Sequence, residues 1–332
     1  MTNFRIVNVT LDLSGMENQT PITEFRVVAF STRADYKWAL FTLFFSLYIV
    51  GVLMNLTTVT VIYSYHHLHS PLYIFLSSLS IVDIYFTSVT VPKLLHMLLS
   101  GNNAVTFTQC LIQMYFFYLA CSIEDLILLS MAYDRYAAIC HPLHYQQILS
   151  IWKCSLFIVG CWVIGSLNAL LLTLPTLKMT FCDSNEIFQF FCETKALTKI
   201  ACAGTDVFYK TIIVEMMPIG LIIFLCTLIS YVKILRVILS IKSTEGRKKA
   251  FSTCSSHLVV FTMYCGTAAS VYLIPSSRHS GFLEEVITVV YAIVTPMLNP
   301  LIYSLRNQEL RTAMETFFGR CNCSLGKFRW NS

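Results

Sequence analysis

Two carboxyl side chains, Asp83 and Glu124, each lie near the middle of a long apolar stretch of the sequence. A carboxylate at the centre of a bilayer costs several kcal/mol, so an acid at such a position marks a functional site by default. Asp125 follows Glu124 directly, but consecutive residues point to different sides of a helix, so the two acids do not share one site. No role for Asp125 follows from its position.

The triplet Asp134-Arg135-Tyr136 stands at the end of the apolar stretch that carries Glu124. A guanidinium group at the end of a membrane span is stable beside a carboxylate, and a partner that offers carbonyl or carboxylate oxygens can draw it away. The triplet therefore indicates a two-state element. The alternative is an interfacial arginine that only reaches lipid phosphates.

Cysteine usage divides the chain into two environments. Of the 13 cysteines, four lie in or beside the polar segments that would face outward, namely Cys110, Cys182, Cys192 and Cys202. An even number of cysteines in an oxidising compartment predicts two disulfides, for which three pairings exist. Spacing alone does not choose among them.

The composition indicates a membrane protein. Hydrophobic residues make up 56% of the 332 residues and charged residues only 12%, whereas soluble domains are about a quarter charged. A helix needs about 20 apolar residues to cross a bilayer. Seven stretches meet that length: Ala39–Tyr63, Leu72–Met97, Cys110–Ile139, Leu156–Leu174, Val207–Ile234, Ala250–Ile274 and Val286–Leu305. The expected fold is an all-α bundle of seven transmembrane helices.

Charge predicts the orientation of the bundle. With the amino terminus outside, the inner segments carry an excess of Lys and Arg, while the outer segments are balanced, as the positive-inside rule requires. The sequons at Asn8 and Asn18 agree, because glycosylation occurs on the outer side. We therefore divide the chain into an outer tail (1–36), a seven-helix domain (37–305) and a cytoplasmic segment (306–332). Arg306–Phe318 is predicted to form an amphipathic eighth helix on the inner leaflet.

Five motifs occur in order along the chain and together resemble one family. They are 68–83 before and within the second stretch, MAYDRYAAICHPLHY at 131–145, ISYVKI at 229–234, RKKAFSTCSSHL at 247–258 and PMLNPLIYSLRN at 296–307. These segments are similar to the signatures of olfactory receptors, the largest branch of rhodopsin-like G-protein-coupled receptors. The resemblance runs from about residue 18 to residue 318.

The resemblance implies specific roles inside the bundle. It pairs Cys110 with Cys192, and Cys182 with Cys202. It makes Asp134, Arg135 and Tyr136 a switch for the G protein. Tyr231 is the residue that would swing toward Arg135 on activation. Asn299, Pro300 and Tyr303 would form a hinge in the seventh helix. Asp83, Glu124 and Asn299 are similar to the sodium or proton pocket of rhodopsin-like receptors; alternatively, the protonated carboxyl groups only hydrogen-bond helices together.

The resemblance also implies a ligand pocket and a function. A small volatile or sparingly soluble odorant would bind in the outer half of the bundle and activate a stimulatory olfactory-type heterotrimeric G protein, which raises cyclic AMP. The implied pocket residues are Phe117, Tyr118, Cys121, Ser122, Glu215, Ile219, Ala268, Ala269 and Tyr272. Glu215 could recognise an amine or a hydroxyl group, or it could face outer water and Lys210. Plain helix packing is the alternative for the other pocket residues.

Location and partners follow from the same resemblance. We expect a multi-pass protein of the plasma membrane, in the cilia of olfactory neurons, whose partners are the odorant, the G protein and the lipid bilayer. No basic and aromatic patch suggests a nucleic-acid partner. No catalytic residues, metal ligands or cofactor are expected, apart from a sodium ion near Asp83 and Glu124.

Leu72 and Ile74 stand where the family usually has Met and Phe, and four further positions depart from the family pattern. Met54 replaces a glycine, for which Gly51 one turn earlier could substitute. Cys265 stands where the family has an aromatic switch residue, Asp125 is not part of the pattern, and Gln189 replaces a histidine of an outer-loop metal motif. Alternative functions remain a non-olfactory chemosensory receptor and an ion-conducting or transport protein. A retinal photoreceptor would need a lysine in the last span, and 282–305 contains none.

Overall fold

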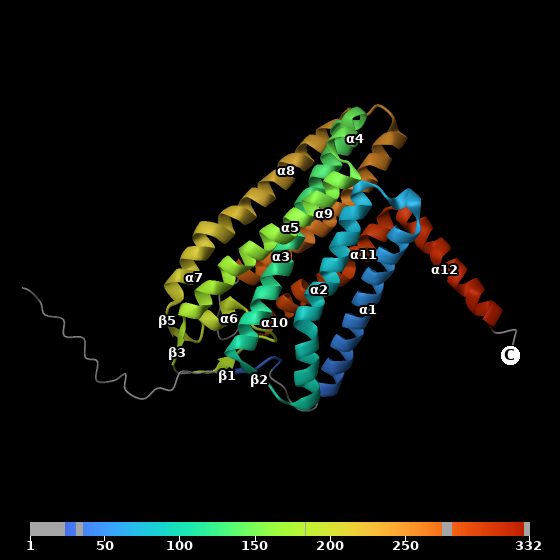
Figure 1. Ribbon diagram of the computed structural model, residues 1–332. Coiled ribbons are helices and arrows are strands. Elements are labelled where there is room, and N and C mark those ends of the chain that lie inside the picture. Colours follow the sequence, from blue (N-terminus) through green and yellow to red (C-terminus); the bar gives the residue numbers. More distant parts are fainter. Residues whose placement is uncertain (1–23, 31–35, 183, 274–280, 329–332) are drawn as a thin grey trace, which may run out of the picture.

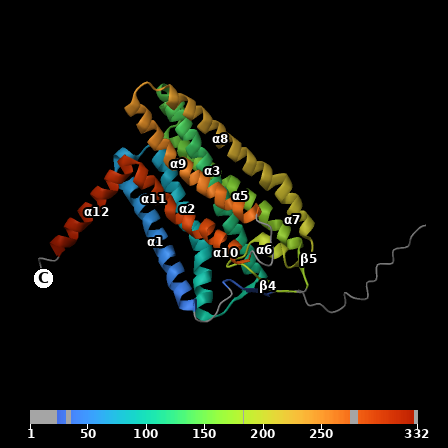
Figure 2. The same cartoon turned by 180° about the vertical axis from the view of Figure 1, so that it is seen from behind.

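The computed structural model describes residues 24–30, 36–182, 184–273 and 281–328. Long helices run side by side in one bundle (Figures 1 and 2). The first four long helices are α1 (Lys37–Ser64), α2 (Pro71–Ser100), α3 (Phe107–Cys140) and α5 (Ile151–Thr173). The fifth is continuous from α7 (Thr205–Thr211) through a π-helical turn, Ile212–Met216, to α8 (Met217–Ser240).

The remaining helices complete the predicted set. The sixth long helix is α9 (Thr244–Leu273), and the seventh runs from α10 (Gly281–Val289) through a π-helical turn, Val290–Val294, into α11 (Thr295–Arg306). Two short helices, α4 (Tyr145–Ile148) and α6 (Thr194–Thr198), lie in connections. The helices extend beyond the predicted stretches at most ends, because polar turns of a helix can continue outside the hydrocarbon core.

Among the described residues, six of the long helices are apolar enough along their length to cross a membrane. α9 falls short of that criterion although it has 30 residues. Its first turns carry Arg247 and Lys248, and Ser, Thr and His residues follow within the helix. It nevertheless packs with α3, α8, α10 and α11 as a member of the bundle. The sixth predicted span is thus the most polar of the seven.

The helix boundaries follow from local sequence. Pro71 at the first position of α2 needs no hydrogen-bond partner for its nitrogen, and Gly101 ends that helix in the left-handed region at φ 72°. Thr106 and Gln109 form a capping box at the start of α3, in which each side chain accepts a hydrogen bond from the other residue's backbone N–H. Ser150 caps α5 by accepting from the N–H of Lys153.

α3 is the central helix, since it packs against α2, α5, α8 and α9. The approach of α5 depends on Gly165, where an added Cβ atom would lie 2.9 Å from a side-chain carbon of Ile123. By contrast α1, α5 and α8 expose most of their large apolar side chains, such as Leu53, Ile164 and Leu221. An apolar face of this kind suits lipid tails rather than water.

Five short strands occur among the described residues, at one end of the bundle (Figures 1 and 2), and they were not predicted. β1 (Glu24–Val27) pairs antiparallel with β2 (Ala104–Thr106) and parallel with β4 (Glu186–Ile187). β3 (Thr180–Phe181) pairs antiparallel with β5 (Ala201–Ala203). Part of the predicted outer tail is therefore hydrogen-bonded to the loops that close this end. α4 and the connection between α8 and α9 lie at the opposite end.

The last helix, α12 (Gln308–Phe328), extends away from the bundle (Figure 1). It begins after Asn307, and the Asn307 side chain accepts a hydrogen bond from the N–H of Leu310 at 3.1 Å. Leu310 and Ala313 are buried on one side, whereas Arg311 and Glu315 form an exposed ion pair on another. The helix is therefore amphipathic, and it runs ten residues beyond the predicted end at Phe318.

Candidate functional site

Asp83, Glu124 and Asn299 come from α2, α3 and α11, and all three are buried. The Asn299 side-chain nitrogen donates to both carboxyl oxygens of Asp83 at 3.1 Å. Among the residues that the structure describes, both carboxyl oxygens of Glu124 and the side-chain oxygen of Asn299 have no hydrogen-bond partner. Three unsatisfied oxygens beside a carboxyl group form a donor set that suits a small hard cation or an added proton.

Arg135 is held by the residue that precedes it. Its Nε donates to Oδ2 of Asp134 at 2.8 Å, and its Nη2 contacts the same oxygen. The other oxygen of Asp134 accepts from the hydroxyl group of Tyr145 in α4 at 2.6 Å. Burial and the nearby Asp134 raise the pKa of Tyr145 above its usual value, so this hydroxyl keeps its proton and remains a donor. Asp134 and Tyr145 thus hold Arg135 in one position, and we call this arrangement the Arg135 lock.

His257 of α9 connects three helices near this lock. Its Nε2 lies 3.0 Å from the carbonyl oxygen of Leu128 in α3, and its Nδ1 lies 2.6 Å from the hydroxyl of Tyr231 in α8. A carbonyl only accepts hydrogen bonds, so Nε2 carries the proton and Nδ1 accepts from Tyr231. The two rings also stack at 5.6 Å. In this structure Tyr231 is therefore bound to α9 and not to Arg135.

Tyr136 and the seventh helix complete the predicted switch region. The Tyr136 hydroxyl lies 3.2 Å from Nε2 of His141, and the Lys233 amine lies 5.3 Å from the centre of its ring. Pro300 lies inside α11, and the Tyr303 hydroxyl reaches the sulfur of Met131 at 4.0 Å. Pro300 lacks an N–H, which loosens the helix where Asn299 meets Asp83.

The departure at Met54 is explained by the contact between α1 and α11. Asn55 donates from its side chain to the carbonyl oxygens of Gly51 and Pro296, each at 3.1 Å. An added Cβ atom on Gly51 would lie 3.4 Å from Cβ of Met297. Gly51 therefore supplies the close approach between the two helices that position 54 does not.

The predicted pocket residues of α3 divide between two faces. Phe117 is buried among rings, with Phe86 at 5.3 Å, Phe191 at 4.8 Å and Tyr291 at 6.4 Å between centroids. One turn further along, the Cys121 sulfur lies 3.1 Å from the hydroxyl of Tyr291. This face of α3 meets aromatic side chains from α2, the outer loop and the seventh helix.

The second face contains Tyr118 and Ser122. The Tyr118 hydroxyl donates to Oγ1 of Thr194 in α6 at 2.9 Å. Ser122 donates to the Tyr118 carbonyl oxygen and accepts from the side chain of Asn168 in α5 at 2.9 Å. This face therefore links α3 to α5 and to the outer loop.

The other predicted pocket residues are less enclosed. Ile219 is 42% exposed, Ala268 is half-buried and Ala269 is exposed. The side chains of Glu215 and Tyr272 lie outside the described residues, as do Asn8 and Asn18. The structure brings the predicted residues Phe117 and Cys121 together with Phe86, Phe191 and Tyr291. These three aromatic residues were not predicted to line the pocket. Nothing in the local sequence singles these aromatic residues out, because they meet only through helix packing.

The end of the bundle that carries the strands is closed by covalent and ionic contacts. Disulfides join Cys110 of α3 to Cys192, and Cys182 to Cys202, which are the two pairings that the resemblance implied. The backbone N–H of Phe30 donates to both carboxyl oxygens of Glu285 in α10 at 3.1 Å. The tail, the outer loop and the seventh helix are thus tied to one another.

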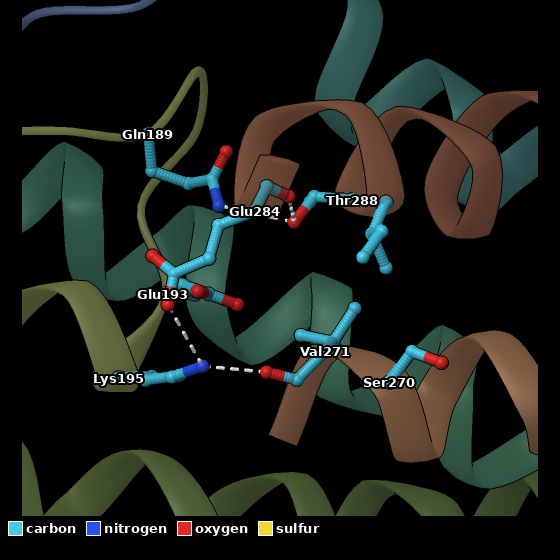
Figure 3. Close-up of a pocket in the computed structure, with 8 residues that line it drawn as sticks. Gln189, Glu193, Lys195, Ser270, Val271, Glu284 and Thr288 are labelled. Carbon is cyan, nitrogen blue, oxygen red and sulfur yellow. Dashed lines mark hydrogen bonds and ion pairs between the residues drawn. The ribbon is translucent and has the colours of Figure 1, made fainter. Parts of the chain in front are cut away.

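A small cavity with polar walls lies under the outer loop (Figure 3). The Lys195 amine contacts the carbonyl oxygen of Val271 at 2.5 Å and a carboxyl oxygen of Glu284 at 3.4 Å. Lys199 contacts the other oxygen of Glu284 at 2.8 Å. Burial raises the pKa of Glu193, beside them, from 4.5 to about 6 despite the two lysines. These residues join the loop to α9 and α10.

Comparison with known proteins shows to which family the chain belongs. The profile described as "Olfactory receptor" matches residues 44–320. Olfactory receptor 1 of Rattus norvegicus is 42% identical over 301 residues, which cover 91% of this chain and 96% of that protein. Olfactory receptor 1F1 of Homo sapiens is 41% identical over 303 residues (91% and 97%), and Olfactory receptor 7C1 of Homo sapiens 42% over 303 residues (91% and 95%). The chain belongs to the olfactory receptor family, whose members are seven-helix G-protein-coupled receptors that sense odorants.

Proposed function

We propose that this receptor binds a small volatile or sparingly soluble molecule in the outer half of its bundle and activates a stimulatory, olfactory-type G protein. One observation carries the proposal: α3 bears the aromatic cluster around Phe117 and Cys121 toward one end and the Asp134–Arg135 lock at the other. A single central helix can transmit a change between the two, because it packs against four other long helices.

We propose that the strand-bearing end of the bundle faces outside. Both disulfides lie at that end, and disulfides persist in oxidising compartments. The opposite end has the excess of Lys and Arg that is typical of cytoplasmic segments. The Arg135 lock then faces the G protein, and α12 lies on the inner leaflet. We place this multi-pass protein in the plasma membrane of sensory cilia.

Asp83, Glu124 and Asn299 form the proposed ion or proton site. The buried oxygens without partners favour this assignment over simple helix cross-linking, since an unsatisfied buried oxygen is costly unless a cation or proton meets it. A sodium ion bound there would compensate the charge of one of the two acids and hold α2, α3 and α11 in one arrangement. Its release would allow the seventh helix to move at Pro300.

Weak and broad ligand binding is expected. A ligand of about 10–15 heavy atoms in a mostly apolar pocket gains roughly 4–8 kcal/mol, which corresponds to millimolar to micromolar affinity. Such affinities permit several related odorants to act on one receptor.

The test is a cyclic AMP assay in cells that express this chain with an olfactory-type G protein and respond to a diverse odorant panel. Staining of a tag on the amino terminus of unpermeabilised cells measures surface expression and orientation together. We expect a dose-dependent rise that Arg135→Ala abolishes at equal surface level. A wild-type signal that persists in Arg135→Ala would contradict the switch, and a tag accessible only after permeabilisation would contradict the orientation.

A further inference from the structure

Two of the departures from the family pattern, Asp125 and Cys265, lie together in the structure. Asp125 of α3 is half-buried, and its carboxyl group interacts with the hydroxyl of Tyr264 in α9. The neighbouring thiol of Cys265 is close enough for the charge of Asp125 to act on it. A small side chain therefore stands next to an unusual carboxyl group, where the family has a bulky aromatic residue.

Asp125 continues the aromatic face of α3. Phe117, Cys121 and Asp125 follow one another at intervals of four residues, so they lie on the same side of the helix. Tyr264 closes this face from α9: its hydroxyl donates to the Cys121 carbonyl oxygen at 3.3 Å, and its ring lies 5.8 Å from that of Tyr291. The face thus leads from the outer ring cluster to a carboxyl group about two turns deeper.

The surroundings of Asp125 contain no compensating positive charge within the part of the chain that the structure describes. The group that contacts it is the phenol of Tyr264. The adjacent Glu124 is buried, and neither of its carboxyl oxygens has a hydrogen-bond partner. On the same helix, Arg135 is ten residues away, about 15 Å along the axis, and is already bound to Asp134. Asp125 thus has no basic side chain paired with it among the described residues.

We propose that Asp125 is the counter-ion for an ammonium group on the ligand, so that this receptor prefers primary or secondary amines with an apolar or aromatic body. The inference rests on the proposed function and names its ligand class. The body of the amine packs against Phe117 and Tyr291, and the ring of Tyr264 adds a cation–π contact. Cys265 has a smaller side chain than the aromatic residue that the family has at this position, so it obstructs the approach to the carboxylate less.

Energetics favours a charged ligand over a neutral one. A carboxylate inside the membrane is costly when it stands alone, whereas a hydrogen-bonded ion pair repays much of that cost. A neutral alcohol would gain one ordinary hydrogen bond and leave the negative charge uncompensated. The preference should therefore appear between ligands that share one carbon skeleton and differ only in the polar group.

The experiment compares 2-phenylethylamine, 2-phenylethanol and ethylbenzene, together with aliphatic sets of the same design, in the cyclic AMP assay. We expect the amines to act at the lowest concentrations. Asp125→Asn should raise their half-maximal concentrations at least about tenfold and leave the alcohols within about twofold, while Asp125→Glu retains the preference. Asp206→Asn, at an exposed acid in α7, is the matched control. Cys265→Tyr should reduce the amine response by filling the space beside Asp125.

The outcomes separate this inference from the proposed function. A receptor that responds to neutral odorants through Arg135 but gives no preference to amines overturns the inference alone. A surface-expressed receptor that responds to nothing in a diverse panel contradicts the proposed function. If Asp125→Asn does not reach the surface, Cys265→Tyr decides: an unchanged amine-to-alcohol ratio in that variant overturns the inference, and a tenfold lower ratio supports it.

Discussion

The hydroxyl of Tyr145 lies 2.6 Å from Oδ1 of Asp134, the carboxyl group whose other oxygen holds Arg135. The arginine is therefore not locked by its neighbour alone. Asp134 is buried, and it divides its two oxygens between a guanidinium group on α3 and a phenol on α4. A contact between the end of the third helix and the following loop thus helps to hold the arginine that we propose as the G-protein switch.

Tyr145→Phe should raise the basal activity of the receptor. The change removes only the hydroxyl group, and a hydrogen bond to a charged acceptor contributes about 1.5–3 kcal/mol. Loss of even the lower value from the locked form shifts the equilibrium toward the active form at least about tenfold. The measurement is cyclic AMP without odorant at matched surface expression.

Tyr63→Phe serves as the control for this variant, because Tyr63 is 66% exposed on α1 and far along the sequence from the lock. The increase should disappear in the double variant with Arg135→Ala, which cannot couple. Basal activity of Tyr145→Phe equal to wild type would show that the phenol does not contribute to the lock.

Asp83→Asn should remove the sodium dependence of basal activity. The amide keeps the size of the side chain and a hydrogen bond to Asn299, but it removes the charge that attracts a cation. Cyclic AMP is measured without odorant while sodium in the medium is replaced by a large organic cation. Wild type should become more active as sodium is withdrawn, and Asp83→Asn should not respond.

The same replacement of sodium is carried out on Asp206→Asn. This control tests whether removal of any acidic side chain abolishes the sodium dependence of basal activity. Glu124→Gln offers a second variant, since its buried oxygens lack partners and would be ligands in the same site. Basal activity that is independent of sodium in the wild-type receptor would contradict the sodium ion and leave Asp83 and Glu124 as a proton site or as groups that only link helices.

The seven helices were predictable because the sequence contains an apolar stretch for each of them, although α9 is more polar than the other six. Residues that are neighbours in a motif, such as Asp134 and Arg135, were also found, because their contact is local. Tyr145 lies in the same motif, yet its bond to Asp134 depends on how the chain turns through α4. The hydrogen bond from His257 to Leu128 depends on the packing of α9 against α3, which no local sequence pattern predicts.

The outer end was the least predictable part. Its strands contain two to four residues, too few to show an alternating pattern. Lys195 and Glu284 are 89 residues apart, and Phe30 and Glu285 are 255 apart, so their contacts emerge only from the folded chain. Only the disulfides of this end were anticipated, and they came from the resemblance rather than from spacing.

The raised pKa of Glu193 predicts how the stability of the outer end of the bundle depends on pH. Burial raises its pKa from 4.5 to about 6, opposed by Lys195 and Lys199 and reinforced by Glu284, while Gln189 acts as a hydrogen-bonding neighbour. The folded protein therefore holds a proton on Glu193 in a range where the unfolded chain has lost it. Stability from this group is greatest below pH 4.5 and falls by about 2 kcal/mol as the pH rises through 6.

Glu193→Gln should remove that part of the pH dependence, because an amide resembles the protonated acid at every pH. Thermal unfolding of the purified receptor in detergent, measured at pH 5 and pH 7, gives the comparison. Wild type should lose melting temperature from pH 5 to pH 7 relative to Glu193→Gln, whereas Glu186→Gln on the same loop should follow wild type. Other acids contribute equally to both proteins, so the difference between them isolates Glu193. Parallel curves for wild type and Glu193→Gln would mean that the carboxyl group is solvated, and the closed arrangement of the loop over α10 would then be wrong.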